Sequence, residues 1–465
     1  MIFEPYSLAC LSHASYFVAD EGTKSAVVVD PQRDVDRYLD AAKRHGVAIR
    51  HVFLTHFHAD FVSGHLELAR ATGAVIHVGA RGKTEYPAVP ARDGDVLELG
   101  RVRIRVLETP GHTPESVCLL VFDLAKSATD PYAVLTGDTL FLGDVGRPDL
   151  AASGGARVED LAGMLYDSIH SKILPLPDAT LVYPAHGAGS LCGKSLSTES
   201  CTTLGVQRKT NYALSGMPKD QFVRLVTSDQ PETPAYFGYD ADLNRRRRAT
   251  LDEALPKALN PLLAAEVLAL LDAGAGVLDV RSQAEFAAGH LKGSVNVPLG
   301  GRYATWAGAV LSREVPIVLI APAGKEAEAA MRLMRIGFDG VAGYLEGGAA
   351  ALAALPPARR ATTRRASAAE LRARLSAENP PLVLDVRAAS EWAAGHVKGS
   401  QNVPLQRLRE RLAEVPRDRD IVVHCQSGYR SAVAVSVLQG EGYDRLTDLV
   451  GGWQAWEALG APARA

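Results

Sequence analysis

A repeat with a constant spacing constrains the fold of this chain more than any other feature of its sequence. Asp279-Val280-Arg281 recurs as Asp385-Val386-Arg387, and Asn296-Val297-Pro298-Leu299 recurs as Asn402-Val403-Pro404-Leu405, each 106 residues later. The same spacing joins Glu285 to Glu391, Gly289-His290 to Gly395-His396, and Gly293-Ser294 to Gly399-Ser400. A constant offset over many matches indicates two copies of one domain, which we place at 250–355 (the middle copy) and 363–465 (the last copy).

Both copies have the residue pattern of a small α/β domain. The expected strands are 276–280 and 316–320 in the middle copy, and 382–386 and 420–424 in the last copy. The expected amphipathic helices are 327–337 and 431–442. Buried apolar strands that alternate with helices predict a parallel sheet covered on both faces.

The first part of the chain, residues 1–245, is richer in β-branched segments and in histidine. Strands are expected at 26–30, 51–55, 75–78, 101–109, 116–122, 133–137 and 180–183, with helices such as 35–45 and 61–72 between them. This order predicts two packed sheets with outer helices. Residues 227–251 and 355–365 show little periodicity and are interpreted as linkers, with the run Arg245 to Arg248 as a solvated connector.

Composition places the chain among globular proteins and excludes several classes of function. A length of 465 residues suggests about three domains. The formal net charge of -3 gives no basic field for nucleic acid or an anionic membrane. The first residues lack the pattern of a secretory signal, and no apolar run has the length of a membrane helix. Five scattered cysteines do not make a disulfide framework, so a reducing, cytoplasmic setting is expected.

Four expected strands end in histidine or aspartate flanked by glycine and proline. His56, His58 and Asp60 follow the first of these strands, and His112, Asp138 and His186 follow the other three. Loops at strand ends can direct side chains from several strands to one point. The alternative is four unrelated turns with capping aspartates, but the order of all four segments favours a metal site.

These segments resemble the sequential metal motifs of the metallo-β-lactamase superfamily. The resemblance implies an αββα sandwich with the site at the edge of its two sheets. The family usually has a sixth residue, histidine, after His-x-His-x-Asp, where this chain has Phe61. Phe61 cannot bind a cation, which disfavours the dinuclear zinc site of thiolester hydrolases. A mononuclear site with two histidines and one carboxylate suits iron(II), one ion per chain, with open positions for ligands.

Among the iron-containing members, the chain resembles the persulfide dioxygenases. That resemblance implies His56, His112 and Asp138 as metal ligands, with His58, Asp60 and His186 behind them to orient the ligands and tune bound water. It also places an arginine after the third strand, matched by Arg147. Two roles stay open for Arg147, substrate binding and local ion pairing.

The last copy contains a cysteine in a setting that suits sulfur chemistry. Cys425 follows an expected strand and opens an expected helix, where backbone N–H groups and the helix dipole stabilise a thiolate. Gly428 lets the loop curl, and Arg430 adds positive charge. Four residues separate Cys425 from Arg430, one fewer than in cysteine phosphatases, and the smaller ring suits sulfur transfer. A buried structural cysteine is the alternative.

The loop and its neighbouring motifs resemble the rhodanese family. The resemblance implies that Cys425 carries a persulfide, that Arg430 assists it, and that Gln426, Ser427, Gly428 and Tyr429 bind the substrate. Asp385, Arg387, Glu391 and His396 are interpreted as structural, because their counterparts persist in the middle copy. There, Ala321 replaces the cysteine and Glu326 the arginine, so the middle copy is expected to be inactive and to serve packing or assembly.

The order of the three domains resembles bacterial fusions of a persulfide dioxygenase with a sulfurtransferase. The resemblance implies oxidation of a small thiol persulfide by O2 to sulfite, followed by sulfur transfer through Cys425 to give thiosulfate. It also implies a dimer or tetramer, without nucleic acid or membrane partners. The alternatives are a zinc hydrolase of glyoxalase type fused to a sulfurtransferase, and a non-enzymatic sulfur sensor. Cys201 is either a persulfide-accepting thiol or a structural cysteine, and Cys10, Cys118 and Cys192 have no supporting context.

Overall fold

The computed structural model describes residues 1–150, 155–194, 196–230, 232–460 and 463–464. Contacts divide the chain into two compact units. The first holds Met1–Asp252 with Arg335–Gly337, and the second holds Glu253–Met334 with Phe338–Ala465. Both units are mixed α/β, which confirms the expected fold class.

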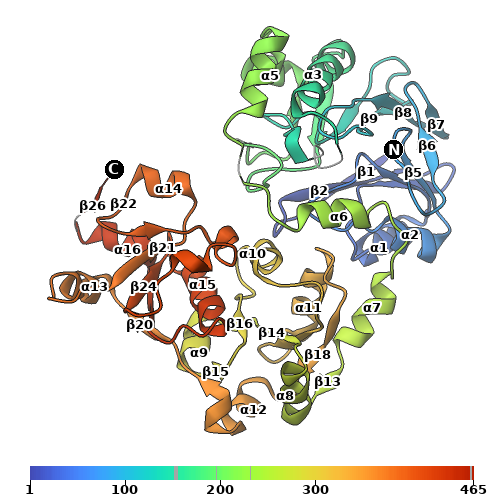
Figure 1. The fold of residues 1–465 in the computed structure, drawn as a ribbon. Helices are drawn as coiled ribbons and strands as arrows, with labels where there is room; N and C mark the ends of the chain where they lie inside the picture. The colour runs from blue at the N-terminus through green and yellow to red at the C-terminus, as the bar shows by residue number, and fades with distance from the viewer. Residues whose placement is uncertain (151–154, 195, 231, 461–462, 465) are drawn as a thin grey trace. The chain divides into compact units, whose positions relative to one another are not determined.

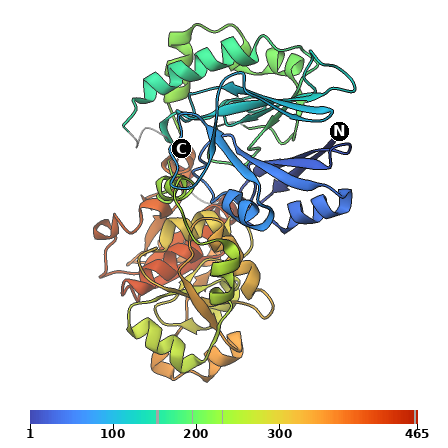
Figure 2. The ribbon, with the colours of Figure 1, turned by 90° about the vertical axis from the view of Figure 1, so that its right-hand side faces the viewer.

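The first unit is built on two six-stranded sheets (Figures 1 and 2). The first sheet has the order β1-β2-β3-β4-β5-β6, with β1 (Ile2–Leu8), β2 (His13–Asp20), β3 (Ser25–Val29), β4 (Ala48–Leu54), β5 (Val75–Gly79) and β6 (Val89–Ala91). The second has the order β12-β11-β10-β9-β8-β7, with β7 (Val96–Leu99), β8 (Val102–Glu108), β9 (Val117–Asp123), β10 (Ala133–Gly137), β11 (Leu181–Pro184) and β12 (Thr202–Thr203).

Alternating side chains pack both faces of each sheet. In β2, Tyr16 and Val18 join the core between the sheets, where they meet residues of β8 and β9. Phe17 and Ala19 point the other way and pack against the outer helices. Successive residues of a strand face opposite sides, so a strand that is buried throughout indicates layers on both faces. The result is the αββα sandwich that the motifs predicted.

Helices cover the outer face of each sheet. The first sheet carries α1 (Asp36–His45) and α2 (His65–Thr72), and the second carries α3 (Val158–Ser168), η2 (Ile169–Ile173), α4 (Leu204–Thr210), η3 (Tyr212–Leu214) and α5 (Lys219–Thr227). Charge complements the dipole of α1, which has Asp36 in its first turn and three basic residues in its last. Gly46 ends α1 in the left-handed conformation, at φ 62°.

The second unit contains two five-stranded parallel sheets with the same topology. The middle copy has the order β13-β18-β17-β14-β16, with β13 (Pro261–Leu262), β14 (Gly276–Asp279), β16 (Val295–Asn296), β17 (Ile317–Ile320) and β18 (Val341–Leu345). The last copy has the order β20-β25-β24-β21-β23, with β20 (Arg364–Ala366), β21 (Leu382–Asp385), β23 (Gln401–Asn402), β24 (Ile421–His424) and β25 (Leu446–Leu449). Two short ladders, β15 (His290–Leu291) with β19 (Arg360–Ala361) and β22 (His396–Val397) with β26 (Ala463–Arg464), complete the unit.

The helices of the two copies correspond except at one place. The middle copy has α8 (Ala264–Asp272), α9 (Gln283–Ala288), α10 (Tyr303–Val310), α11 (Glu326–Met334) and α12 (Gly348–Ala354). The last copy has α13 (Ala368–Leu375), α14 (Ala389–Ala394), α15 (Tyr429–Gly440) and α16 (Gly452–Ala458). In place of α10, it has two 3-10 turns, η5 (Leu405–Arg407) and η6 (Leu412–Glu414).

Both expected linkers were wrong in part. Residues 227–251 contain α6 (Phe237–Leu243) and lead into α7 (Leu251–Ala258). Arg248 is no solvated connector, because its guanidinium is buried in an ion pair with Glu67, at 2.6 Å. In 355–365, η4 (Pro357–Arg359) and β19 are ordered by pairing with β15. Neither segment has amphipathic periodicity, because a buried ion pair holds the first and a short backbone ladder holds the second, rather than an apolar stripe.

Candidate metal centre and sulfur-transfer loop

Loops that follow four strands bring the expected metal-site residues together at one edge of the sandwich. His56 and His58 follow β4 of the first sheet, and His112, Asp138 and His186 follow β8, β10 and β11 of the second. Backbone hydrogen bonds join the two sheets at this edge, from Val117 N to Thr55 O and from Ala14 N to Ala185 O. The site therefore depends on the packing of both sheets.

One cluster contains His56, His112 and Asp138, whose ligand atoms lie within 4.8 Å of one another. Asp138 Oδ2 lies 3.7 Å from His56 Nε2 and 3.5 Å from His112 Nε2. That oxygen is buried and has no hydrogen-bond partner among the residues that the structure describes. An orphaned buried carboxylate oxygen is costly, so the three donors fit a cation held between them.

Hydrogen bonds fix the tautomer of both imidazoles in this cluster. His112 Nδ1 donates to the carbonyl of Arg147 at 2.8 Å. The Thr55 hydroxyl donates to Asp30 at 2.7 Å, so its oxygen accepts from His56 Nδ1 at 3.0 Å. Each ring thereby presents an unprotonated Nε2 toward Asp138, as a metal ligand must.

A second cluster, His58, Asp60 and His186, lies directly behind the first. His186 Nδ1 donates to Asp138 Oδ1 at 2.7 Å, and its Nε2 lies 3.0 Å from Asp60 Oδ2. His58 Nε2 lies 3.0 Å from Asp30 Oδ1. His186 is thus positioned to orient Asp138, whereas His58 pairs with Asp30.

Burial and charge shift the pKa values of these groups in opposite directions. Burial lowers the pKa of His56 well below its usual range and also lowers the pKa of His112, which favours neutral rings. Burial acts to raise the pKa of Asp138, but His186, His56 and His112 hold it well below its usual range. Burial acts to lower the pKa of His186, but the carboxylates of Asp138 and Asp60 raise it well above its usual range.

Phe61 occupies the corner where the superfamily motif would supply a further ligand. Its ring is 1% exposed and lies 4.5 Å from the ring of His58 and 4.1 Å from that of His13. Both ring nitrogens of His13 are buried without a hydrogen-bond partner in the described parts of the chain. Sequence reasoning missed His13, which has no motif around it.

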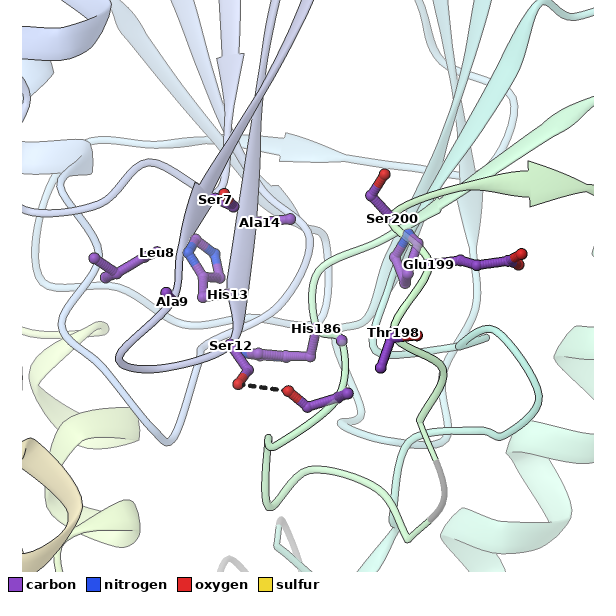
Figure 3. Close-up of a pocket in the computed structure, with 13 residues that line it drawn as sticks. Ser7, Leu8, Ala9, Ser12, His13, Ala14, His186, Thr198, Glu199 and Ser200 are labelled. Carbon is purple, nitrogen blue, oxygen red and sulfur yellow. Dashed lines mark hydrogen bonds between the residues drawn. The ribbon is translucent and has the colours of Figure 1, made fainter. Parts of the chain in front are cut away.

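A pocket of about 370 Å³ lies beside the second cluster (Figure 3). The hairpin of β1 and β2 forms one side, with Ser12 and His13, and His186 lies between this hairpin and Thr198 and Glu199 on the other side. Ser12 Oγ donates to the Ala188 carbonyl at 2.8 Å and ties the two sides together. The pocket therefore offers hydroxyl and imidazole groups in apolar surroundings.

Arg147 lies beside the centre, but its guanidinium is already paired. It is 2% exposed and donates two hydrogen bonds to Asp149, at 2.8 and 2.5 Å. Its own carbonyl orients His112. Its neighbour Gly146 has no room for a side chain, since a Cβ there would lie 1.9 Å from Asp138 O. The geometry favours ion pairing over substrate contact for Arg147.

Asn244, which lies in no recognisable motif, supports the loop that carries His58. Its side-chain amide donates to His58 O at 2.9 Å and to Phe61 O at 2.8 Å, and its Oδ1 accepts from Ser63 N at 2.8 Å. These bonds hold residues 58–63 outside a helix. The expected helix 61–72 therefore begins only at His65, as α2.

Cys201 lies next to Ser200 of the pocket but is itself partly buried against the core between the sheets. This packing agrees with a structural cysteine. None of the five cysteines forms a disulfide bond.

In the last copy, Cys425 lies at the end of β24 and immediately before α15. Gly428, at φ 104°, turns the loop so that its N–H donates to Cys425 Sγ at 3.1 Å. Cys425 O approaches Gly452 so closely that a Cβ there would lie 2.3 Å away. The sulfur is buried, at the N-terminus of a twelve-residue helix. This geometry suits a sulfur anion.

Side chains around the loop hold it in place. The Arg430 guanidinium donates to both oxygens of Glu391, at 2.6 and 2.7 Å. Gln426 Oε1 accepts from Arg387 at 3.3 Å, whereas Ser427 is exposed. Glu391 was interpreted as a fold residue, yet it positions the loop arginine directly. A charged pair split between a helix and a distant loop gives no local sequence signal.

Comparisons with known proteins identify the families of the domains. The family model described as Metallo-beta-lactamase superfamily matches residues 8–186, and that described as Rhodanese-like domain matches residues 263–355 and 367–459. The human mitochondrial persulfide dioxygenase ETHE1 is 30% identical over 246 residues, which cover 53% of this chain and 86% of that protein. A hydroxyacylglutathione hydrolase from Polaromonas sp. is 34% identical over 175 residues, 37% of this chain and 61% of that protein.

A solved structure extends the similarity into the second unit. The crystal structure of a metallo-beta-lactamase from Staphylococcus aureus is 32% identical, with a TM-score of 0.65, and the match covers 74% of this chain and 98% of that one. In the described residues, no helix has both the length and the apolarity needed to cross a membrane.

Proposed function

Because the chain belongs to the metallo-β-lactamase superfamily and carries two rhodanese-like domains, we propose that it is a non-haem iron(II) persulfide dioxygenase fused to a sulfurtransferase. The observation that carries the proposal is the group of His56, His112 and Asp138 with Phe61 beside it. The first three offer two imidazoles and one carboxylate to one ion, and Phe61 fills the place of a ligand to a second. The proposal includes one iron(II) per chain and three domains, at 1–245, 250–355 and 363–465.

The residues around the centre are buried, which keeps bulk solvent away from the proposed oxidation. His56, His112 and Asp138 would hold iron(II), which supplies open positions for a persulfide sulfur and for O2. Arg147 O and His186 keep two of these ligands in one orientation. In the proposed reaction both atoms of O2 reach the terminal sulfur, water supplies the third oxygen of sulfite, and the thiol leaves with a proton.

The Cys425 loop supports the second reaction. The Cys425 thiolate attacks the outer sulfur of a second persulfide, the S–S bond of the donor breaks, and the donor leaves as a protonated thiol. Sulfite then attacks the outer sulfur held on Cys425, an S–S bond of thiosulfate forms, and the thiolate is regenerated. The Gly428 N–H and the helix N-terminus stabilise the sulfur anion at both stages.

A zinc-dependent thiolester hydrolase is the second candidate, because the Polaromonas hydroxyacylglutathione hydrolase is 34% identical over the region it shares with this chain. It would act at the same cluster. Phe61 argues against it, since the dinuclear centre would lack a ligand there.

The deciding experiment measures oxygen uptake by the full chain reconstituted with iron(II), with glutathione persulfide as substrate. We expect persulfide-dependent uptake, and we expect His112→Ala to abolish it because one of three ligands is lost. His77→Ala is the matched control for folding, because the His77 ring bonds His51 within the first sheet and belongs to neither cluster. Bound zinc with thiolester hydrolysis and without oxygen uptake would establish the hydrolase instead.

A further inference from the structure

The middle copy contacts the helix that begins at the Cys425 loop. Tyr429, the first residue of α15, donates from its hydroxyl to Pro298 O at 2.5 Å. Two turns after Tyr429 in the same helix, Ser436 Oγ accepts from Asn296 N at 2.9 Å. Asn296 and Pro298 belong to the repeated Asn-Val-Pro-Leu segment of the middle copy. Both copies contain this segment, and the segment of the inactive middle copy contacts the helix that follows the active loop.

Arg332 of α11 holds this segment of the middle copy in shape. Its guanidinium donates to Leu299 O at 2.6 Å and to Gly301 O at 3.3 Å, and it lies 5.1 Å from the centre of the Tyr303 ring. Gly301 lies beside the Tyr429 ring, where a Cβ would be in ordinary van der Waals contact, 3.5 Å from Cε2. The contact between the copies is therefore fixed on both sides.

The helix α10 is the element that distinguishes the middle copy, and it packs against α15 (Figure 1). Seven of its eight residues are buried, as expected of a helix enclosed on all sides. One of them, Trp306, has its ring centre 5.8 Å from the guanidinium carbon of Arg430. The same guanidinium forms a bidentate pair with Glu391.

We propose that Trp306 is a positioning residue for sulfur transfer, supplied to the active loop by the inactive copy. Glu391 pairs with the Arg430 guanidinium, and the guanidinium carbon lies over the Trp306 ring. Arginine accepts both contacts at once because its charge is planar and delocalised. Together they fix a positive charge beside the sulfur of Cys425, where a small anionic acceptor such as sulfite must approach. The proposal rests on the sulfurtransferase part of the proposed function.

Steady-state sulfur transfer by the full chain tests this role, from thiosulfate to cyanide and from glutathione persulfide to sulfite, with Trp306→Leu and Trp306→Phe compared. Leucine fills the space without a π face, whereas phenylalanine retains one. We expect Trp306→Leu to lower kcat/KM about tenfold, mainly through a higher acceptor KM, from the range of cation–π strengths. Trp306→Phe should restore most of the loss.

Phe338→Leu is the matched control, because it removes a ring that lies 4.0 Å from another arginine of the middle copy, Arg313. It should leave the acceptor KM unchanged. Equal kinetics for Trp306→Leu and wild type would overturn the proposal, as would equal losses in the leucine and phenylalanine variants, which indicate packing alone. A wild-type chain without any transfer would instead refute the proposed sulfurtransferase itself.

Discussion

The middle and last copies share one fold but differ in the loop that carries the chemistry. In both, an aspartate and an arginine two residues later form a buried pair, Asp279 with Arg281 at 2.6 Å and Asp385 with Arg387 at 2.7 Å. In both, that arginine also donates to a glycine carbonyl, at 2.9 and 2.6 Å. These contacts connect the first long strand to the helix after it, and so they belong to the fold.

The loops have the same backbone shape but opposite electrostatics. Gly324 and Gly428 both have positive φ, at 77° and 104°, and a helix begins soon after each. Ala321 replaces the nucleophile, and Pro322 has no N–H to offer to an anion. Glu326 places a carboxylate at the helix N-terminus, where the last copy has a cation. The difference shows that loop shape is required by the fold and that reactivity is a separate property.

The largest effect should come from the nucleophile itself. Cys425→Ala should reduce sulfur transfer on the order of a thousandfold or more, because no other group can form the persulfide. Oxygen uptake should persist, and the product should change from thiosulfate to sulfite, measured by chromatography of the sulfur anions. The equivalent change in the other loop, Ala321→Ser, should alter neither product. Enzymatic thiosulfate formation by Cys425→Ala would remove the distinction between the copies.

A smaller effect is expected at Glu391, which holds the arginine that the middle copy lacks. Burial acts to raise the pKa of Glu391, but the Arg430 hydrogen bonds keep it below its ordinary 4.5. Folding therefore favours the ionised carboxylate, so this stabilisation is present above pH 4.5 and is lost as the pH falls through the folded value. Glu391→Gln should lower transfer about tenfold at neutral pH, from the strength of charged hydrogen bonds.

The pH profile gives the independent check at this position. Wild-type transfer should decline as the pH falls below 4.5, and Glu391→Gln should show a flatter profile over that interval. Glu285 is the counterpart of Glu391 in the middle copy, and it accepts a hydrogen bond from Ser282 N at 3.0 Å. Glu285→Gln should leave transfer unchanged. A steep decline that persists in Glu391→Gln would assign the pH dependence to another group.

The smallest effect should follow from returning the nucleophile to the middle copy. In a Cys425→Ala background, Ala321→Cys should restore no transfer, because Pro322 and Glu326 still oppose a sulfur anion. The measurement is transfer from thiosulfate to cyanide, with wild type as reference. A rate above the uncatalysed reaction would show that the cysteine alone separates an active loop from an inactive one.

Much of the fold followed from local pattern. The strands at 26–30 and 133–137 correspond closely to β3 and β10, because a strand buried on both faces is a continuous apolar run. The strand expected at 51–55 covers the buried end of β4, which begins three residues earlier, at Ala48. The helix expected at 61–72 and the linker at 227–251 were misread for a single reason. Asn244 and Arg248, in the second segment, bind the first, at His58 O and Glu67 respectively. Hydrogen bonds between segments that are distant in sequence leave no periodicity.

Residue type and spacing were enough to predict a repeated domain, a loop with a nucleophile in only one copy, and donors for a metal. These properties do not depend on how the segments meet. The convergence of the donors depends on sheet packing, because His56 follows a strand of one sheet, whereas His112 and Asp138 follow strands of the other. Only the tertiary structure brought Trp306 of the inactive copy to Arg430 of the active one. Side-chain contacts between domains depend on how the domains pack, and the sequence of one segment does not reveal them.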